Sequence, residues 1–271
     1  MKNNFLPTVI LLSTMLLSCD EGDTPIPHQS PLILPLRLEL DDYKRELIFD
    51  EENRLSRVKT SSLMPDDVVL ESTMEYFYAA DGKLERVVTD QGYRLEFTRQ
   101  GDKIVRTDEY LQGTFSQYHT FRYDVKGRLH EFLTWQDILG EGEVVAKSKA
   151  VFLYDNNDNL TNQFLYYYHT GLNGHVLLTS FEYSDYDNHV EAESLFDGYA
   201  FNPEAVFSKN NPGKMVTKNG TGNISLVDQY SYVYNGRGYA TSKTTTSVFS
   251  HNGSGGSYET RYFYEERSTS P

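Results

Sequence analysis

Cysteine is almost absent from this chain of 271 residues, and Cys19 is the only one. A single cysteine has no disulfide partner within the chain. Proline is also scarce, since Pro65 is the only proline between Leu36 and Asn202. Because proline cannot donate a hydrogen bond to a strand ladder, this scarcity favours a continuous antiparallel sheet over that stretch.

Basic residues are in the minority, with 25 Lys and Arg against 39 Asp and Glu and a formal net charge of −14. The bases are scattered singly, whereas a groove that follows nucleic-acid phosphates needs a clustered basic patch. The composition therefore predicts no nucleic-acid partner. Long apolar runs are missing too, because the run from Phe5 to Leu17 is too short to span a bilayer as a helix.

The sequence also lacks the common catalytic and metal-binding motifs. It has neither a Gly-x-Ser-x-Gly nucleophile motif nor a glycine-rich phosphate loop, and its seven histidines show no paired ligand spacing. The oxygen-rich stretch 155–159 is followed by Leu160, where a calcium loop of the EF-hand type needs glycine. We therefore expect no metal, no cofactor and no catalytic residue. A catalytic carboxylate pair stays open, because 39 acids offer many pairs and the sequence singles out none.

What the chain does contain is a repeated hairpin pattern, clearest at residues 120–132. Tyr123 ends a stretch in which aromatic and polar residues alternate at the two-residue period of a strand. Asp124 starts a turn, and Gly127 can supply the positive φ that closes a short loop. Leu129 then begins the returning strand. The pattern predicts a strand, a tight turn and a second strand.

The same unit recurs along most of the chain. In each copy an aromatic residue is followed about four residues later by Gly, Asn or Asp, and then by an apolar residue. The unequal spacing argues against a strict solenoid. We predict an all-β fold, an antiparallel meander of hairpin repeats that forms a curved sheet or an open, porin-like barrel. The copies begin at Phe49, Tyr78, Phe97, Tyr123, Tyr154, Tyr183 (a looser match) and Tyr234, and Tyr264 looks like the front half of one more.

The first residues are predicted to be a targeting segment. Residues 1–18 combine an early lysine with a short apolar run, as a signal peptide does. The run ends Leu16-Leu17-Ser18-Cys19, which resembles a bacterial lipobox. This resemblance implies a lipoprotein signal peptide and lipidation of Cys19, which would anchor the protein to the membrane through acyl chains.

A short linker is predicted between the anchor and the folded part. Residues 19–35 contain four prolines and form a lipidated tether. The acidic residues from Asp20 to Asp23 resemble the surface-export signal of Bacteroidetes lipoproteins, and a solvated tether is the alternative. We thus expect an outer-membrane lipoprotein of the cell envelope, exposed at the cell surface if that signal operates. Residues 36–271 are predicted to be a single β-meander domain with an irregular insert near 191–223.

Two families resemble the folded part. Residues 123–129 (Tyr-Asp-Val-Lys-Gly-Arg-Leu) match the tyrosine-aspartate repeat of Rhs and teneurin shells at every defined position. Asn202-Pro203 and residues 208–212, ahead of residues 230–234, look like the closing region of a Bacteroidetes lipoprotein family of unknown function. That second resemblance implies a porin-like antiparallel sheet and no known activity.

Aromatic residues are the candidate ligand-binding side chains. Tyr166, Tyr167 and Tyr168 lie in one predicted strand, so at least one ring faces away from the core. Trp135 is the only tryptophan. These rings could stack on sugars or pack a two-sided sheet. We predict a non-enzymatic binding module for a glycan or an envelope protein, and the alternative is a glycan-cleaving enzyme that uses an unrecognised carboxylate pair.

Overall fold

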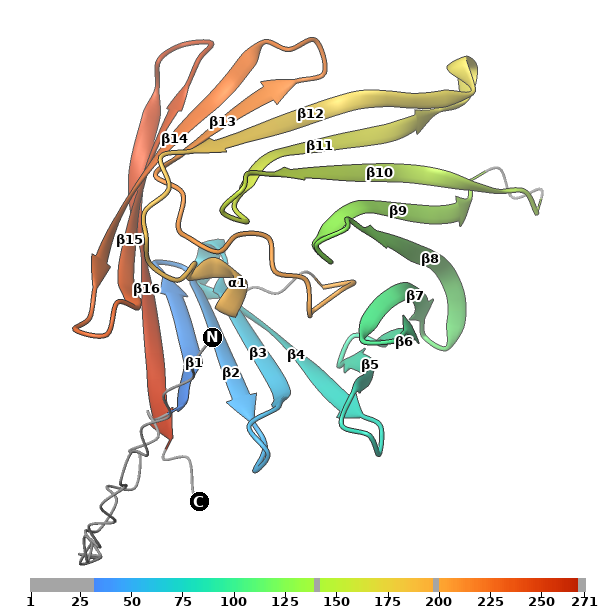
Figure 1. Ribbon diagram of the computed structural model, residues 1–271, viewed down its shortest axis with the longest axis horizontal. Coiled ribbons are helices and arrows are strands. Elements are labelled where there is room, and N and C mark those ends of the chain that lie inside the picture. Colours follow the sequence, from blue (N-terminus) through green and yellow to red (C-terminus); the bar gives the residue numbers. More distant parts are fainter. Residues whose placement is uncertain (1–31, 139–141, 197–199, 268–271) are drawn as a thin grey trace, which may run out of the picture.

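The computed structural model describes residues 32–138, 142–196 and 200–267. In this part of the chain the strands follow one another as an antiparallel meander, and the last strand pairs with the first. The result is a closed barrel of sixteen strands (Figure 1). The predicted all-β antiparallel meander is confirmed, and the barrel is closed rather than open.

The first eight strands are connected by short turns and one 3-10 helix. These elements are β1 (Leu32–Leu40), β2 (Tyr43–Phe49), β3 (Leu55–Leu63), η1 (Pro65–Asp67), β4 (Val69–Tyr78), β5 (Leu84–Thr89), β6 (Tyr93–Gln100), β7 (Lys103–Leu111) and β8 (Thr114–Tyr123).

The second half follows the same plan except after β12, where a long connection holds the one α-helix of the described residues. Its elements are β9 (Leu129–Asp137), β10 (Val144–Tyr154), β11 (Leu160–His169), η2 (Thr170–Leu172), β12 (Gly174–Ser184), α1 (Glu193–Phe196), β13 (Lys214–Asn219), β14 (Ile224–Tyr234), β15 (Ala240–Phe249) and β16 (Gly255–Arg267).

The hairpin units form tight turns because the acidic residue organises them. In the unit predicted at residues 120–132, Asp124 Oδ1 accepts hydrogen bonds from the backbone N–H groups of Lys126 and Arg128, at 2.9 and 3.0 Å. Gly127 has φ +79°, as the turn prediction requires. Asp50, Asp155 and Asn235 organise their turns in the same way.

In four of the units a tyrosine hydroxyl forms a hydrogen bond to the preceding unit. Tyr123 Oη donates a 2.6 Å hydrogen bond to the carbonyl of Ile104, the residue that leaves the preceding turn. Tyr154 donates in the same way to Leu129 at 2.7 Å. Where Phe97 has no hydroxyl, the guanidinium of Arg99 donates to the Leu84 carbonyl instead, at 3.4 Å. Equivalent tyrosine bonds join Tyr78 to Leu55 and Tyr264 to Ala240.

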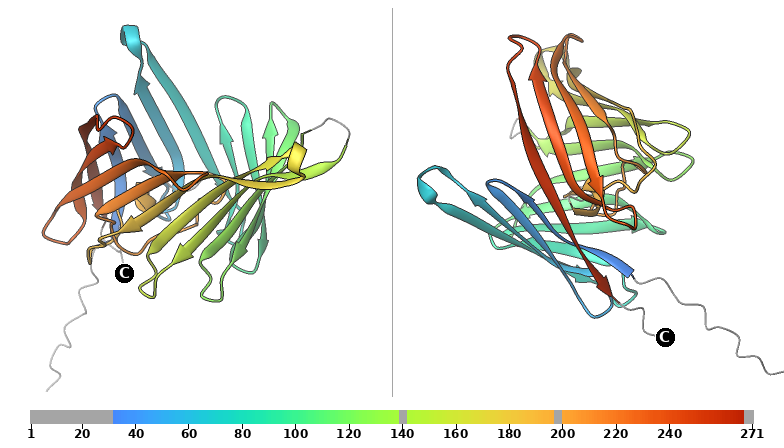
Figure 2. Two further views of the ribbon diagram at one scale, coloured as in Figure 1. Left: turned by 90° about the horizontal axis from the view of Figure 1, so that it is seen from above. Right: turned by 90° about the vertical axis from the view of Figure 1, so that its left-hand side faces the viewer.

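These turns lie at one end of the barrel, which we call the short-turn rim. The described chain begins and ends there, since Leu32 pairs with Arg267. The other end, the far rim, carries the β1–β2 turn, the β3–β4 connection and the β11–β12 connection. Figure 2 shows that the β3–β4 hairpin projects beyond its neighbours.

The unit expected at Tyr183 does not form a hairpin. β12 ends at Ser184, and residues 185–196 and 200–213 fold into the interior of the barrel before β13 begins. We call this stretch the inner segment; its helix α1 lies inside the ring of strands (Figure 1). The irregular insert expected near 191–223 overlaps it, although residues 214–219 form β13.

Two apolar clusters join the wall to the inner segment. One gathers residues of β7 to β11, such as Phe152, with Ala205 and the flanking Phe201 and Phe207 of the inner segment. The other gathers residues of β1 to β4 and β14 to β16 around Phe196 of α1. The inner segment is therefore part of the hydrophobic core.

The outer face of the wall is charged. Ion pairs of Arg or Lys with Asp or Glu occur on many of its strands. They include Arg37–Glu39, Lys44–Glu46, Arg57–Glu75, Arg94–Glu96, Arg106–Asp108, Lys218–Glu182 and Arg261–Glu259.

Candidate functional site

The two ends of the inner segment are clamped together at the short-turn rim. Asp187 accepts a hydrogen bond from the backbone N–H of Asn211 at 3.1 Å, and the Asp187 N–H donates to the Asn211 carbonyl at 3.0 Å. Tyr234 of β14 donates to the Asp187 carboxylate, and its ring stacks on His189 with centroids 3.8 Å apart. This clamp fixes where the segment enters and leaves the barrel.

The helical part of the segment is held from both sides. The Glu191 carboxylate accepts the backbone N–H groups of Glu193 and Ser194, at 2.8 and 2.7 Å, and so caps the start of α1. Asn211 accepts the N–H of Ala192 at 2.9 Å. Phe196, which is 1% exposed, packs against aromatic rings of β16.

The second half of the segment forms hydrogen bonds with β6, β7 and β8 on the opposite side of the barrel. Thr107 donates to the carbonyl of Phe201 at 2.6 Å, and Asn202 donates to the Tyr123 hydroxyl at 2.8 Å. The Glu204 carboxylate accepts hydrogen bonds from both terminal nitrogens of Arg99. The inner segment therefore bridges two walls of the barrel and divides the lumen.

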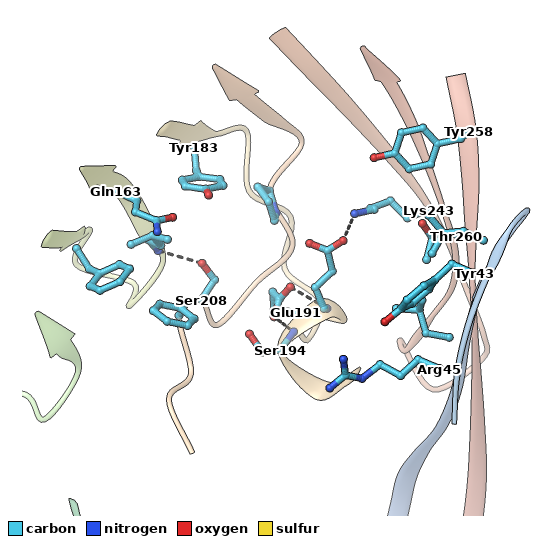
Figure 3. Close-up of a pocket in the computed structure, with 17 residues that line it drawn as sticks. Tyr43, Arg45, Gln163, Tyr183, Glu191, Ser194, Ser208, Lys243, Tyr258 and Thr260 are labelled. Carbon is cyan, nitrogen blue, oxygen red and sulfur yellow. Dashed lines mark hydrogen bonds and ion pairs between the residues drawn. The ribbon is translucent and has the colours of Figure 1, made fainter. Parts of the chain in front are cut away.

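A cavity of about 620 Å³ lies between the inner segment and the wall (Figure 3). This volume falls within the range of small-ligand sites, about 300–1,000 Å³. Its polar lining comes from both sides: Tyr43, Arg45, Lys243, Tyr258 and Thr260 from β2, β15 and β16, Gln163 and Tyr183 from β11 and β12, and Glu191, Glu193, Ser194 and Ser208 from the inner segment.

The cavity is lined by charged groups of both signs, Arg45 and Lys243 on one hand and Glu191 and Glu193 on the other. Lys243 donates to the Glu193 carboxylate, and its ammonium lies 5.0 Å from the centre of the Tyr230 ring. The pKa of Glu191 is raised to about 7, first by burial and then by the nearby Glu193 carboxylate, while the hydrogen bonds from α1 act in the opposite direction. The cavity thus holds one formed ion pair and one carboxyl group that changes charge near neutral pH.

Two hydroxyl groups on the wall around the Lys243–Glu193 pair lack hydrogen-bond partners. Tyr262 Oη and Thr245 Oγ1 are buried without one, and their residues are 3% and 0% exposed. Burial raises the pKa of Tyr262 strongly, so this hydroxyl stays protonated. Buried polar groups are normally satisfied by protein, water or ligand.

A buried histidine on β8 forms a second polar cluster. His119 Nε2 lies 3.1 Å from Glu109 Oε2, and its Nδ1 lies 3.2 Å from Thr134 Oγ1. The order hydroxyl, imidazole, carboxylate is that of a nucleophile, a general base and the carboxylate that orients the base. However, Phe201 and Phe132 stack on the imidazole, and His119 is 1% exposed. Burial lowers its pKa, and the cluster serves to hold the inner segment.

The four aromatic residues proposed from the sequence lie outside this cavity. Trp135 is on the outer face, where it stacks on Tyr118 with centroids 5.8 Å apart and donates to Thr120. Tyr166 and Tyr168 share that face, the first with Lys149 over its ring and the second edge-on to His175. Tyr167 points to the inner face and is 39% exposed. The structure therefore does not gather the four rings into one site.

The residues that line the cavity were not found from the sequence. The sequence indicated an irregular insert, but no pattern in it predicts that Glu193 pairs with Lys243, which lies 50 residues away. A faint signal exists, since Lys243 stands among threonines at an inward position of a strand. Cys19, the predicted lipidation site, lies outside the described residues.

Neither a metal site nor a membrane-spanning helix appears in the described part of the chain. No group of three or more His, Asp or Glu residues is placed to hold a metal ion there. None of the helices in residues 32–138, 142–196 and 200–267 is long and apolar enough to cross a membrane.

Comparison with solved structures identifies the class of fold. A porin-like protein from Bacteroides uniformis shares it, with a TM-score of 0.58, 13% sequence identity, and coverage of 87% of this chain and 96% of that one. A porin-like protein from Bacteroides vulgatus matches with a TM-score of 0.45 and 11% identity, over 76% of this chain and 97% of that one. The first match shows that the chain has a porin-like barrel fold.

Comparison at the level of sequence finds no related protein. No protein-family model matches the chain, and no match was found among curated proteins.

Proposed function

We propose that this protein is a non-enzymatic binding module of the cell envelope that holds a segment of glycan in its lumen cavity. The observation that carries the proposal is the lining of the cavity. Tyrosine rings, hydroxyl groups, an amide and the Arg45 guanidinium line it together, while its lysine is already paired with Glu193. Such a lining suits a neutral ligand with many hydroxyl groups, which can stack on rings and exchange hydrogen bonds.

The charge on the outer face of the wall favours a barrel that is surrounded by water rather than by lipid. A barrel embedded in lipid needs a broad apolar band on its outside, whereas Arg57–Glu75 and Arg94–Glu96 are among the ion pairs on this wall. Attachment to the envelope would then come from a lipid on Cys19. Since β1 begins at Leu32 on the short-turn rim, the tether would hold that rim toward the membrane and the far rim away from it.

A glycan array tests the binding proposal. The chain from residue 20 onward is probed beside two variants, Gln163→Ala in the cavity and Trp135→Ala on the outer wall. We expect binding that Gln163→Ala weakens and Trp135→Ala leaves intact. The reverse pattern would move the site to the outer aromatic residues, and silence across the array would contradict glycan binding.

Metabolic labelling tests the anchor. In the producing bacterium, an alkyne-tagged fatty acid should label the full chain and leave Cys19→Ala unlabelled. Labelling of both proteins would exclude Cys19 as the lipidated residue.

One observation favours a second function, hydrolysis of a glycosidic bond. Glu191 and Glu193 both line the cavity, and their surroundings differ, since burial raises the pKa of Glu191 while Glu193 is paired with Lys243. Two carboxyl groups in unlike environments can divide the roles of acid and base. Binding without cleavage is preferred, because both Glu191 oxygens already accept backbone N–H groups. Product release that Glu193→Gln abolishes would establish the hydrolase instead.

A further inference from the structure

The tip of the β3–β4 hairpin is apolar on both faces. Leu63 and Val69 are paired across the hairpin on one face, and Leu70 lies on the other. These residues, with Met64 and Val68 at the turn, are 43% to 55% exposed. Exposed apolar patches of this kind commonly mark sites of contact with another molecule.

The same hairpin has an unpaired edge. β4 pairs with β5 only over Met74–Tyr78. Beyond that ladder, Thr73 accepts the backbone N–H of Asp90 at 3.1 Å, and its own N–H donates to the Asp90 carboxylate at 2.9 Å. Residues 69–72 pair with β3 alone, and Figure 2 shows this hairpin projecting past its neighbours.

The direction of the free backbone groups follows from Thr73. In a strand, alternate residues direct their N–H and C=O groups to the same side. Because Thr73 directs both groups toward β5, Glu71 and Val69 direct theirs to that side as well, where β5 has ended. An extended peptide can add to such an edge through main-chain hydrogen bonds.

Charge decides which occupant fits this edge. Glu71, Asp67 and Asp90 are exposed on the hairpin or on its β5 side, and the Asp90 carboxylate lies close enough to accept the Thr73 N–H at 2.9 Å. A second copy of this chain would bring another net charge of −14, and an anionic lipid surface would also be repelled. A basic peptide would be attracted.

We propose that the open edge of β4 at residues 69–72 docks an extended segment of a protein partner. That segment carries Lys or Arg opposite Glu71 and apolar residues opposite Leu70 and Val69. Cross-strand pairs of opposite charge, and of apolar side chains, stabilise such an added strand. This site is separate from the lumen cavity, so it does not depend on glycan binding.

An array of extended peptides tests the proposal with the mature chain. Peptides of about seven residues, the length of a typical added strand, vary at three central positions. We expect enrichment of triplets with Lys or Arg at one end and apolar residues at the other two positions. An array without enrichment, or with acidic triplets enriched, would overturn the proposal.

Three variants check that the peptide binds at this edge. Glu71→Lys should weaken binding of the basic peptides about tenfold and favour acidic ones. Val69→Pro should abolish binding, because it removes one edge N–H at a position where a strand tolerates proline. Glu51→Lys, the same charge change at an exposed residue of the short-turn rim, should change nothing.

Two alternative occupants of the edge, a second copy of the chain and a lipid surface, are tested by separate measurements. Dimerisation of the wild-type chain in sedimentation, lost in Val69→Pro, would assign the edge to a second copy. Cosedimentation with phosphatidylglycerol vesicles, lost in the same variant, would assign it to a lipid surface. Either result would overturn the proposal.

Discussion

The wall and the inner segment of this barrel are built in different ways. In the wall, each unit repeats local contacts, such as Asp124 with its own turn and Tyr154 with the carbonyl of the unit before. In the inner segment many polar contacts join residues distant in sequence, as Arg99 and Glu204 do. The wall is specified by a repeated pattern, and the inner segment by the barrel that surrounds it. Four predictions test this difference, from the largest expected effect to the smallest.

Truncation of Phe196 should show how far the inner segment contributes to the core. The ring is 1% exposed and packs on Tyr262 and Tyr264, so Phe196→Ala should lower the free energy of unfolding by about 3–5 kcal/mol. Denaturant titration measures the change. A loss as small as that of a surface substitution would mean that the segment only lies against the wall.

Glu191 should make the stability of the protein depend on pH. Its pKa is raised from 4.5 to about 7, so its contribution is fully present below pH 4.5 and is lost as the pH rises through 7. The loss is up to about 3 kcal/mol, and Glu191→Gln should remove this part of the pH profile. Thermal unfolding between pH 4 and pH 8 follows it. A variant with an unchanged profile would assign the dependence to another group.

Two tyrosines of the wall form a matched pair. Tyr123 donates to Ile104 and also accepts from Asn202 of the inner segment, whereas Tyr154 only donates to Leu129. We expect Tyr123→Phe to lower stability by about 2 kcal/mol and Tyr154→Phe by about 1 kcal/mol. Denaturant midpoints of the two variants compare them directly. Equal losses would show that the bond to the inner segment contributes nothing.

The ion pairs of the outer wall should matter least. Arg57 and Glu75 are 2.7 Å apart, but each side chain is nearly half exposed. A double-mutant cycle with Arg57→Ala and Glu75→Ala should give a coupling energy below about 1 kcal/mol that decreases with added salt. A larger coupling energy would mean that ion pairs on the outer face contribute substantially to the stability of the barrel.

The site was much less predictable than the fold. The turn chemistry of residues 123–129 was readable because a hairpin is decided by neighbours in sequence. The hydrogen bond from Tyr123 to Ile104 explains why the aromatic recurs, but it becomes visible only when consecutive units stand side by side. The path of residues 185–196 and 200–213 through the lumen had no local signal beyond the break in the pattern.

The sequence by itself determined the strands, their tight turns and their order, because alternation and turn residues act over a few positions. Only the tertiary structure decided that β1 meets β16, that the inner segment fills part of the lumen, and that Glu193 pairs with Lys243. Closure and the cavity depend on contacts between residues far apart in the chain. Such contacts form where burial of apolar surface and pairing of charge are most favourable for the whole barrel.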